Sequence, residues 1–161
     1  MAKELTKQQA LDKLQHYCAY QDRCHQEVRS KLLDLGMRGY DLEDIMASLI
    51  IDKFLDEERY ARSFVRGKFR IKKWGRVKIK QELWSKHLTP YCLKKGFEEI
   101  DEEEYEATLI SILNKKNKLL REKNPYERKG KLARYAIGRG FESHLVWHIL
   151  NEEGIIDILK K

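Results

Sequence analysis

The stretch Cys24–Met37, CHQEVRSKLLDLGM, contains the signals that decide the fold. Glu27 follows Cys24 by three residues, which is the spacing of a capping box at a helix N-terminus. Apolar residues then recur at helical spacing, and Gly36 is the residue type that ends helices in the left-handed conformation. The stretch therefore predicts one complete helix, with its start, its buried face and its end.

Signals of the same kind recur along the rest of the chain. Further helix starts are predicted at or directly after Thr6, Asp41, Asp56, Trp74-Gly75, Thr89, Asp101, Asn124 and Ser143, the last helix running to about Gly154. No segment alternates apolar and polar residues cleanly between hairpin turns, so strands are not expected. The sequence predicts an all-α protein.

The predicted helices also repeat. Val28, Leu32, Leu33 and Met37 correspond to Ile79, Leu83, Trp84 and Leu88, and residues 28, 32, 36 and 37 shifted by 104 give Leu132, Ala136, Gly140 and Phe141. Apolar helix positions recur at three and four residues in any case, but a shared turn position followed by a large apolar residue favours a true repeat. We predict three tandem three-helix repeats, 1–55, 56–100 and 101–161, forming an elongated, curved array. His87 stands at the turn position that Gly36 and Gly140 occupy in the other repeats.

Composition supports an extended, surface-rich protein. Charged residues make up 37% of the 161 residues, and the mean hydropathy is −0.69. No apolar run approaches the ~20 residues of a membrane span, and the first residues lack a signal-peptide core. The three cysteines, Cys18, Cys24 and Cys92, are an odd number without CxxC spacing, which favours reduced thiols. We expect a monomeric cytoplasmic protein that does not associate with membranes.

Patterns typical of enzymes and metal sites are missing. The chain contains no phosphate-binding glycine motif, no nucleophile elbow and no HExxH. Cys18 and Cys24 with a nearby histidine, or His144 with His148 at i, i+4, are conceivable ligand pairs, but each lacks a further ligand at suitable spacing. We expect no catalysis, no metal and no cofactor.

Positive charge is concentrated in the middle of the chain. Between Arg59 and Lys95 there are thirteen basic residues and one acid, so the net charges of 1–58, 59–95 and 96–161 are −4, +12 and −1. At 100° per residue, Arg59, Arg62, Arg66, Arg70 and Lys73 fall within an arc of about 80°, opposite Tyr60, Ala61, Phe64, Val65 and Ile71. Lys72, Arg76, Lys78 and Lys80 continue the positive charge. A solvated helix face is the ordinary interpretation of such a run, but no i, i+4 acids interrupt this one, which favours a polyanionic or acidic partner.

The run from Glu98 to Glu106 is strongly acidic, in contrast to the basic block 59–95. Its place at a predicted helix start suits the macrodipole, and it could also pair with the basic block; it lacks the spacing of a calcium loop. Most large aromatic residues, namely Trp74, Trp84, Trp147, Phe64 and Phe141, are expected in the core, although Trp74 and Phe69 stand beside basic residues and could stack on bases.

Several motifs in this order resemble the RecX regulatory proteins. They are Ala10-Leu11…Leu14, the run from Asp22 to Leu32 with Gly36, Phe54-Leu55-Asp56-Glu57-Glu58-Arg59-Tyr60-Ala61, and Gly75…Ile79…Glu82-Leu83…Lys86. The likeness weakens after about Lys94. Cys24, His87, Phe54 and Glu57 depart from the family pattern at positions that affect capping and local stability.

The resemblance implies three tandem three-helix repeats and control of the RecA recombinase. Family members bind the RecA–DNA filament and mostly suppress its ATP hydrolysis, strand exchange and coprotease activity, within DNA repair, recombination and the SOS response. The expected partners are therefore the RecA filament and single- and double-stranded DNA, the latter bound weakly and without sequence preference. Two alternatives stay open: a stand-alone DNA-binding protein of helix-turn-helix type, and an enzyme built on the histidines and cysteines.

Overall fold

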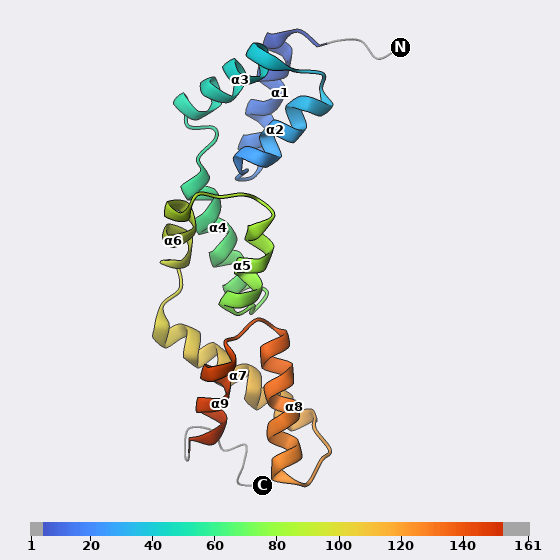
Figure 1. The fold of residues 1–161 in the computed structure, drawn as a ribbon, viewed down its shortest axis with the longest axis vertical. Coiled ribbons are helices and arrows are strands. Elements are labelled where there is room, and N and C mark those ends of the chain that lie inside the picture. Colours follow the sequence, from blue (N-terminus) through green and yellow to red (C-terminus); the bar gives the residue numbers. More distant parts are fainter. Residues whose placement is uncertain (1–4, 153–161) are drawn as a thin grey trace. The chain divides into compact units, whose positions relative to one another are not determined.

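The computed structural model describes residues 5–152, a range that contains nine α-helices and no strand (Figure 1). They are α1 (Lys7–Tyr20), α2 (His25–Asp34), α3 (Gly39–Ile51), α4 (Glu57–Arg70), α5 (Arg76–Trp84), α6 (Pro90–Phe97), α7 (Glu102–Leu119), α8 (Pro125–Gly138) and α9 (Ser143–Asn151). The prediction of an all-α protein is confirmed. Within this range no helix has the length and apolar character needed to cross a membrane.

The chain divides into two compact units. Of the described residues, those within Met1–Phe64 and Leu83–Phe97 belong to the first unit, and those within Val65–Glu82 and Glu98–Lys161 belong to the second. The first unit therefore holds α1, α2, α3, the start of α4, and α6. The second holds the end of α4, most of α5, and α7, α8 and α9.

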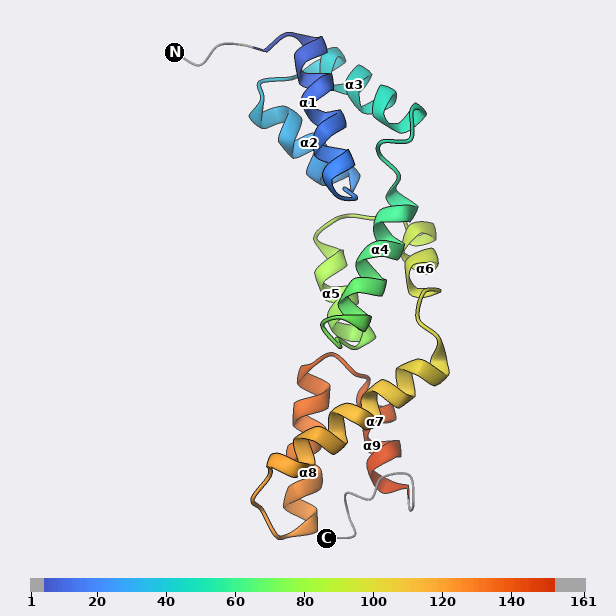
Figure 2. The same cartoon turned by 180° about the vertical axis from the view of Figure 1, so that it is seen from behind.

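Helices α1, α2 and α3 contact one another in the first unit and enclose a common core (Figure 2). Each contributes the apolar face that its periodicity predicts. The core residues are Ala10, Leu14, Cys18, Val28, Leu32, Met37, Leu42, Ile45, Met46, Leu49 and Leu55. Burial of these faces, at about 25 cal/mol per Å² of apolar surface, is the main source of stability here.

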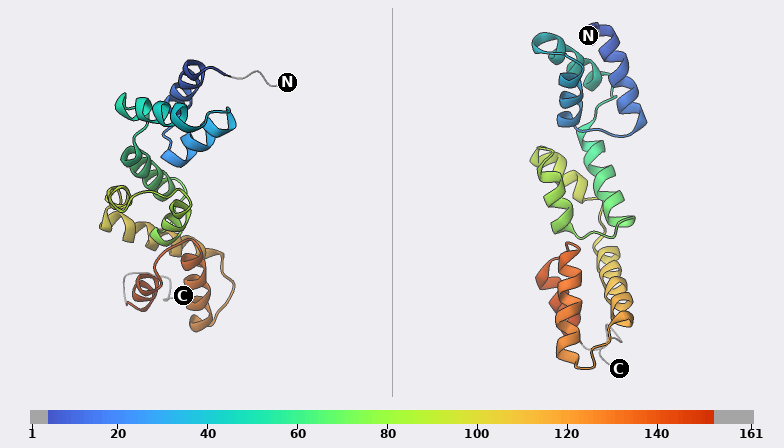
Figure 3. Two further views of the ribbon diagram at one scale, coloured as in Figure 1. Left: turned by 45° about the horizontal axis from the view of Figure 1, so that its top comes forward. Right: turned by 90° about the vertical axis from the view of Figure 1, so that its right-hand side faces the viewer.

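In the second unit, α8 packs against both α7 and α9 (Figure 3). Three aromatic rings run through its core: the Phe69 ring lies 5.6 Å from the Tyr105 ring, which lies 5.0 Å from the Phe141 ring. Because Phe69 is 1% exposed, the expectation that it could stack on bases is wrong.

Most predicted helix starts are confirmed by side-chain caps. Backbone N–H groups donate to the side chains of Thr6, Asp56, Thr89, Asp101 and Asn124. Asp41 was expected to cap a helix, but α3 begins at Gly39 and Asp41 lies in its first turn. Acidic side chains stabilise both positions, so the residue type alone cannot distinguish them. Helix α9 ends at Asn151, and the predicted end at Gly154 lies outside the described residues.

The repeat is visible in the backbone of three turns. Gly36, His87 and Gly140 have φ of +89°, +55° and +100°. Each donates its N–H to the carbonyl three residues earlier, at 3.0, 3.3 and 2.9 Å. Three helices therefore end in the same left-handed conformation, including the one whose turn residue is histidine, and this confirms the register of the repeat.

Two residues expected in the core are exposed instead. Trp84 is 79% exposed and Trp147 38%, whereas Phe141 is buried as predicted. Trp84 directly follows the buried Leu83 and therefore points about 100° away from it. Ile71, which helical periodicity places opposite the arginines, is 78% exposed, because it lies beyond the last residue of α4, where that periodicity no longer applies.

Candidate polyanion-binding surface

The arginines of α4 that belong to the first unit are both ion-paired. Nε of Arg59 donates to Asp22 at 2.7 Å, and its guanidinium also donates to the carbonyls of Lys53 and Phe54 at 3.2 and 3.1 Å. Arg62 donates to the Glu58 carboxylate at 3.1 Å. Arg59 therefore holds the segment that leads into α4 as well as carrying charge.

The arginines of the second unit pair with the acidic run. Arg66 forms a short ion pair with Glu99, Arg70 lies 3.6 Å from Glu104, and Arg76 pairs with Glu102. The alternative that the acidic run pairs with the basic block within the molecule is confirmed. The arginine row expected from the sequence is therefore not free of carboxylate partners. Arg62 pairs with Glu58, an i, i+4 acid that precedes the basic block, whereas Glu99 lies 33 residues from Arg66, where helical spacing gives no signal of it.

Arg76 also belongs to a hydrogen-bonded cluster with Tyr105 and Glu142. Its Nη1 donates to Glu142 at 2.7 Å, its backbone N–H donates to the Tyr105 hydroxyl at 3.0 Å, and that hydroxyl donates to Glu142. Burial raises the pKa of Tyr105, and its bond to Glu142 raises it further. Burial also raises the pKa of Glu142, but the hydrogen bonds from Tyr105 and Arg76 outweigh it, so the Glu142 pKa lies below its usual value. The cluster holds Arg76 in a structural role.

The lysines after α4 carry the positive charge that remains available. Lys72, Lys73 and Lys80 are exposed, and none forms an ion pair with any residue in the described range. Lys78 and Lys68 instead place their ammonium groups 4.5 and 4.9 Å from the centre of the Trp74 ring. The Trp74 indole is therefore already engaged by two cations, and its proposed stacking on bases stays a prediction.

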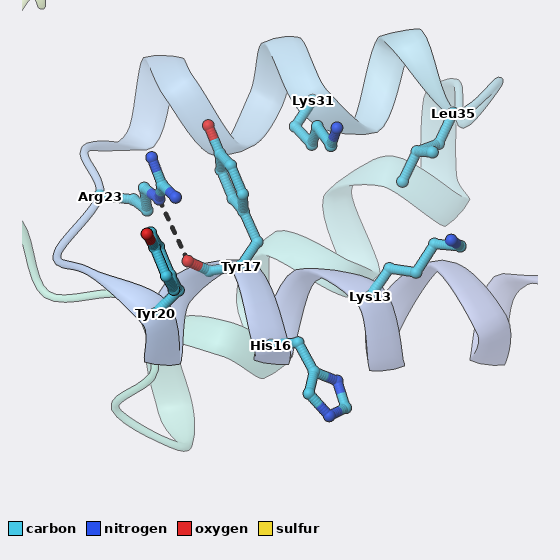
Figure 4. Close-up of a pocket in the computed structure, with 7 residues that line it drawn as sticks. All are labelled: Lys13, His16, Tyr17, Tyr20, Arg23, Lys31 and Leu35. Carbon is cyan, nitrogen blue, oxygen red and sulfur yellow. Dashed lines mark hydrogen bonds between the residues drawn. The ribbon is translucent and has the colours of Figure 1, made fainter.

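Sequence reasoning missed a pocket between α1 and α2, which we call the α1–α2 pocket (Figure 4). It has a volume of about 370 Å³ and is lined by Lys13, His16, Tyr17, Tyr20, Arg23, Lys31 and Leu35. These residues lie in the segment 1–58, whose net charge is negative, so the segment average hid a cluster of cations. Spacing along two separate helices gives no signal of it.

The cysteines and histidines that the sequence offers as ligand pairs lie in different surroundings. Cys18 and Cys24 are buried, and burial raises the pKa of Cys24 to about 11, which keeps its thiol protonated. His148 lies 3.0 Å from Glu152. Among residues 5–152 no three side chains of the metal-ligating types come together.

Comparisons with known proteins agree with these observations. Two RecX family models match the chain: "RecX, second three-helix domain" at residues 56–95, and "RecX, third three-helix domain" at residues 102–150. A "Regulatory protein RecX" from Prosthecochloris aestuarii is 28% identical over 143 residues, which cover 89% of this chain and 92% of the relative. One from Clostridium botulinum strain Eklund 17B is 29% identical over 135 residues, covering 81% of this chain and 61% of the relative.

Solved structures agree on the fold. The crystal structure of RecX from Lactobacillus salivarius superimposes with a TM-score of 0.83 at 19% identity and 96% coverage of both chains. A second crystal structure, of a regulatory protein RecX, gives a TM-score of 0.79 at 21% identity, covering 91% of this chain and 73% of the other. At this level of identity the likeness concerns the fold alone.

Proposed function

Because this chain belongs to the RecX family of regulatory proteins, we propose that it regulates the RecA recombinase without catalysing a reaction of its own. It binds the RecA–DNA filament in the cytoplasm and mostly inhibits ATP hydrolysis, strand exchange and coprotease activity. The observation that carries the proposal is the match of two consecutive family domains, which together cover more than half of the chain.

The filament-facing surface that we propose consists of basic residues of α4, of α5 and of the turn between them, which we call the basic set on α4 and α5. It consists of Arg59, Arg62, Arg66, Arg70, Lys72, Lys73, Arg76, Lys78 and Lys80. The lysines without ion pairs supply charge directly. Apart from Arg76, which the cluster with Tyr105 and Glu142 holds, the paired arginines are 29–52% exposed, so a phosphate or a partner carboxylate can replace their present partners at the surface.

The mechanism requires only differential binding. A protein that binds the filament in a conformation unable to complete the ATPase cycle stabilises that conformation in proportion to its difference in affinity. Contacts to phosphates position the regulator without reading sequence.

The test adds increasing amounts of this protein to RecA on single-stranded DNA and follows ATP turnover. We expect turnover to fall to a plateau at saturation, while the protein alone hydrolyses no ATP. Binding is followed in the same samples by a label on this protein, so that absence of effect is not confused with absence of binding. Unchanged turnover with the filament fully bound would contradict the proposal.

A stand-alone DNA-binding protein is the second candidate, favoured by the exposed Lys80 on α5, one helical turn before the 79% exposed indole of Trp84. Helix faces of this kind can contact bases. Binding to bare double-stranded DNA with a strong sequence preference would support it. Weak binding that is indifferent to sequence is what the filament proposal expects.

A further inference from the structure

We propose that the α1–α2 pocket binds a short acidic peptide segment that carries one apolar side chain. The pocket lies in the first unit, and none of its residues belongs to the basic set on α4 and α5. It would be a second interaction site, one for protein rather than for nucleic acid. The charge of the pocket, its shape and the fixed position of its central tyrosine support this assignment.

The cations of the pocket are not neutralised. Lys13, Arg23 and Lys31 have no carboxylate within ion-pair distance in the described part of the chain, and no acidic residue lines the pocket. By contrast, Lys7 on α1 and Arg29 on α2 pair with carboxylates of α3 at 2.7 and 2.5 Å. Positive charge on these helices is thus paired elsewhere but left open at the pocket, which favours an anionic occupant.

The floor of the pocket is apolar. Figure 4 shows a hollow between the Tyr17 ring and the Leu35 side chain, with Lys13 of α1 and Lys31 of α2 on either side of it, while His16 points away. Tyr17 and Leu35 are both half-buried. An occupant therefore meets an apolar surface with ammonium groups at its rim, which suits a leucine or a phenylalanine flanked by aspartate or glutamate.

The central tyrosine is fixed by its neighbours. Nε of Arg23 donates to the Tyr17 carbonyl at 3.1 Å, and the Arg23 guanidinium carbon lies 3.6 Å from the centre of the Tyr17 ring. The ammonium of Lys31 lies 5.7 Å from the same ring centre. Because two cations already engage this ring, Tyr17 is a poor surface for the stacking of a nucleic-acid base. A leucine or phenylalanine of a peptide needs only apolar contact and does not have to stack on the ring.

The size and charge of the surroundings also favour a peptide. About 370 Å³ accommodates one large side chain with its adjoining backbone, and three cations match a segment with two or three carboxylates. A long nucleic-acid strand would extend over the rest of the segment 1–58, whose net charge is −4 and which repels it. Tyr20, 83% exposed at the edge of the pocket, still gives a base a surface to stack on, so the test includes an oligonucleotide.

The experiment uses the full chain and an amidated peptide, Gly-Ser-Asp-Leu-Glu, labelled with fluorescein at its N-terminus, and follows binding by fluorescence anisotropy at low salt. We expect Lys13→Ala with Lys31→Ala to weaken binding roughly five- to tenfold, since each exposed charge pair contributes up to about 1 kcal/mol. Replacing the peptide leucine by serine should weaken binding by a similar factor. Lys7→Ala is the matched control, an exposed lysine of α1 outside the pocket, and should change affinity less than about twofold.

Several outcomes would overturn the proposal. They are the absence of measurable peptide binding, equal binding of the leucine and serine peptides, or an equal loss of affinity in Lys7→Ala. A labelled oligo-dT that binds more tightly than the peptide, and loses affinity in the Lys13/Lys31 variant, would assign the pocket to nucleic acid instead. Circular dichroism of each variant checks the fold. No RecA is present, so failure here leaves the proposed function untouched.

Discussion

Glu142 joins three helices of the second unit through one carboxylate. It is the N-cap residue of α9, and it accepts hydrogen bonds from Tyr105 of α7 and from Arg76 at the start of α5. Hydrogen bonds to a charged acceptor contribute about 1.5–3 kcal/mol each when the donor is held in place. A single residue therefore links segments that are 66 positions apart in the chain.

The stability that Glu142 contributes depends on pH. The Glu142 pKa is lower in the folded state than in the unfolded state, so the folded state binds fewer protons and the carboxylate stabilises it at neutral pH. This contribution is complete above the ordinary value of 4.5 and is lost as pH falls through the folded value. Glu142→Gln should lower the free energy of unfolding at pH 7 by about 1–3 kcal/mol and flatten its fall below pH 5.

Urea denaturation at a series of pH values measures this effect. Glu106→Gln is a suitable control, since Glu106 lies on the same helix as Tyr105 and forms no ion pair with any residue that the structure describes. Its pH dependence should follow that of the unmodified protein. If Glu142→Gln kept the full acid-induced loss of stability, the role given to this carboxylate would be wrong.

Gly75 allows two backbone segments of the second unit to touch. Its N–H donates to the Arg139 carbonyl at 2.9 Å, and a Cβ at this position would lie 2.3 Å from the Gly140 carbonyl carbon. We predict that Gly75→Ala destabilises the protein by about 2 kcal/mol or more, because backbone atoms cannot move aside as a flexible side chain can. Gly67→Ala, inside α4 with open space around it, should instead be neutral or stabilise by up to about 1 kcal/mol. Equal urea midpoints for the two variants would contradict this.

At the scale of the element, α4 combines two faces with different tasks. Tyr60, Ala61, Val65 and Phe69 are buried, while the arginines on the other side pair with carboxylates. In the second unit those carboxylates come from Glu99 and from the first turn of α7, where acidic residues also stabilise the helix through its macrodipole. The acidic run therefore stabilises the start of α7 and also forms ion pairs with arginines of α4.

The pairing of Arg66 with Glu99 can be tested by charge exchange. Arg66→Glu should destabilise the protein by about 1 kcal/mol, because an exposed pair is lost and like charges face each other. Adding Glu99→Arg to it should recover most of the loss. Lys72→Glu makes the same change of charge at an exposed position without an ion pair among the described residues, and it should stay within about 0.5 kcal/mol. Thermal unfolding reports all three, and additive effects of the two substitutions would argue against the pair.

At the scale of the whole molecule, the net charge of the basic block overstates the positive charge that is available to an anionic partner. The block 59–95 carries +12, yet Arg59, Arg62, Arg66, Arg70 and Arg76 are all paired with carboxylates. The charge that can release counterions from a polyanion lies mainly on the exposed lysines. Binding should therefore depend more on lysines than on arginines, contrary to what the sequence pattern suggested.

Salt dependence measures this difference. Replacing Lys72, Lys73 and Lys80 together by Gln should reduce the slope of log K against log salt for single-stranded DNA by about 2, since each phosphate contact contributes about 0.7. Replacing Arg66 and Arg70 by Gln should reduce it by less than about 1, because their charge is partly neutralised already. A larger effect of the arginine pair would show that these ion pairs open on binding.

Local signals in the sequence predicted most of the helices correctly. Caps such as Thr6, Asp101 and Asn124 act on backbone groups two or three residues away, so their effect can be inferred without knowing the rest of the fold. The repeat was predictable for the same reason, because the left-handed turn at Gly36, His87 and Gly140 is a property of the turn residue and its neighbours. The prediction that Asp41 caps a helix was wrong, because aspartate is favoured both at the N-cap and in the first turn of a helix.

The sequence by itself thus determined the helices, their buried faces, the repeat and the family, all of which depend on interactions between near neighbours in the chain. Only the tertiary structure decided which charges are paired, that Trp84 is exposed, and that Lys13, Arg23 and Lys31 surround one pocket. The physical reason is distance along the chain. Apart from local pairs such as Arg62 with Glu58 on α4, these ion pairs and the pocket are made by residues on different helices or loops, and periodicity within one helix contains no information about which side chains another segment brings to it.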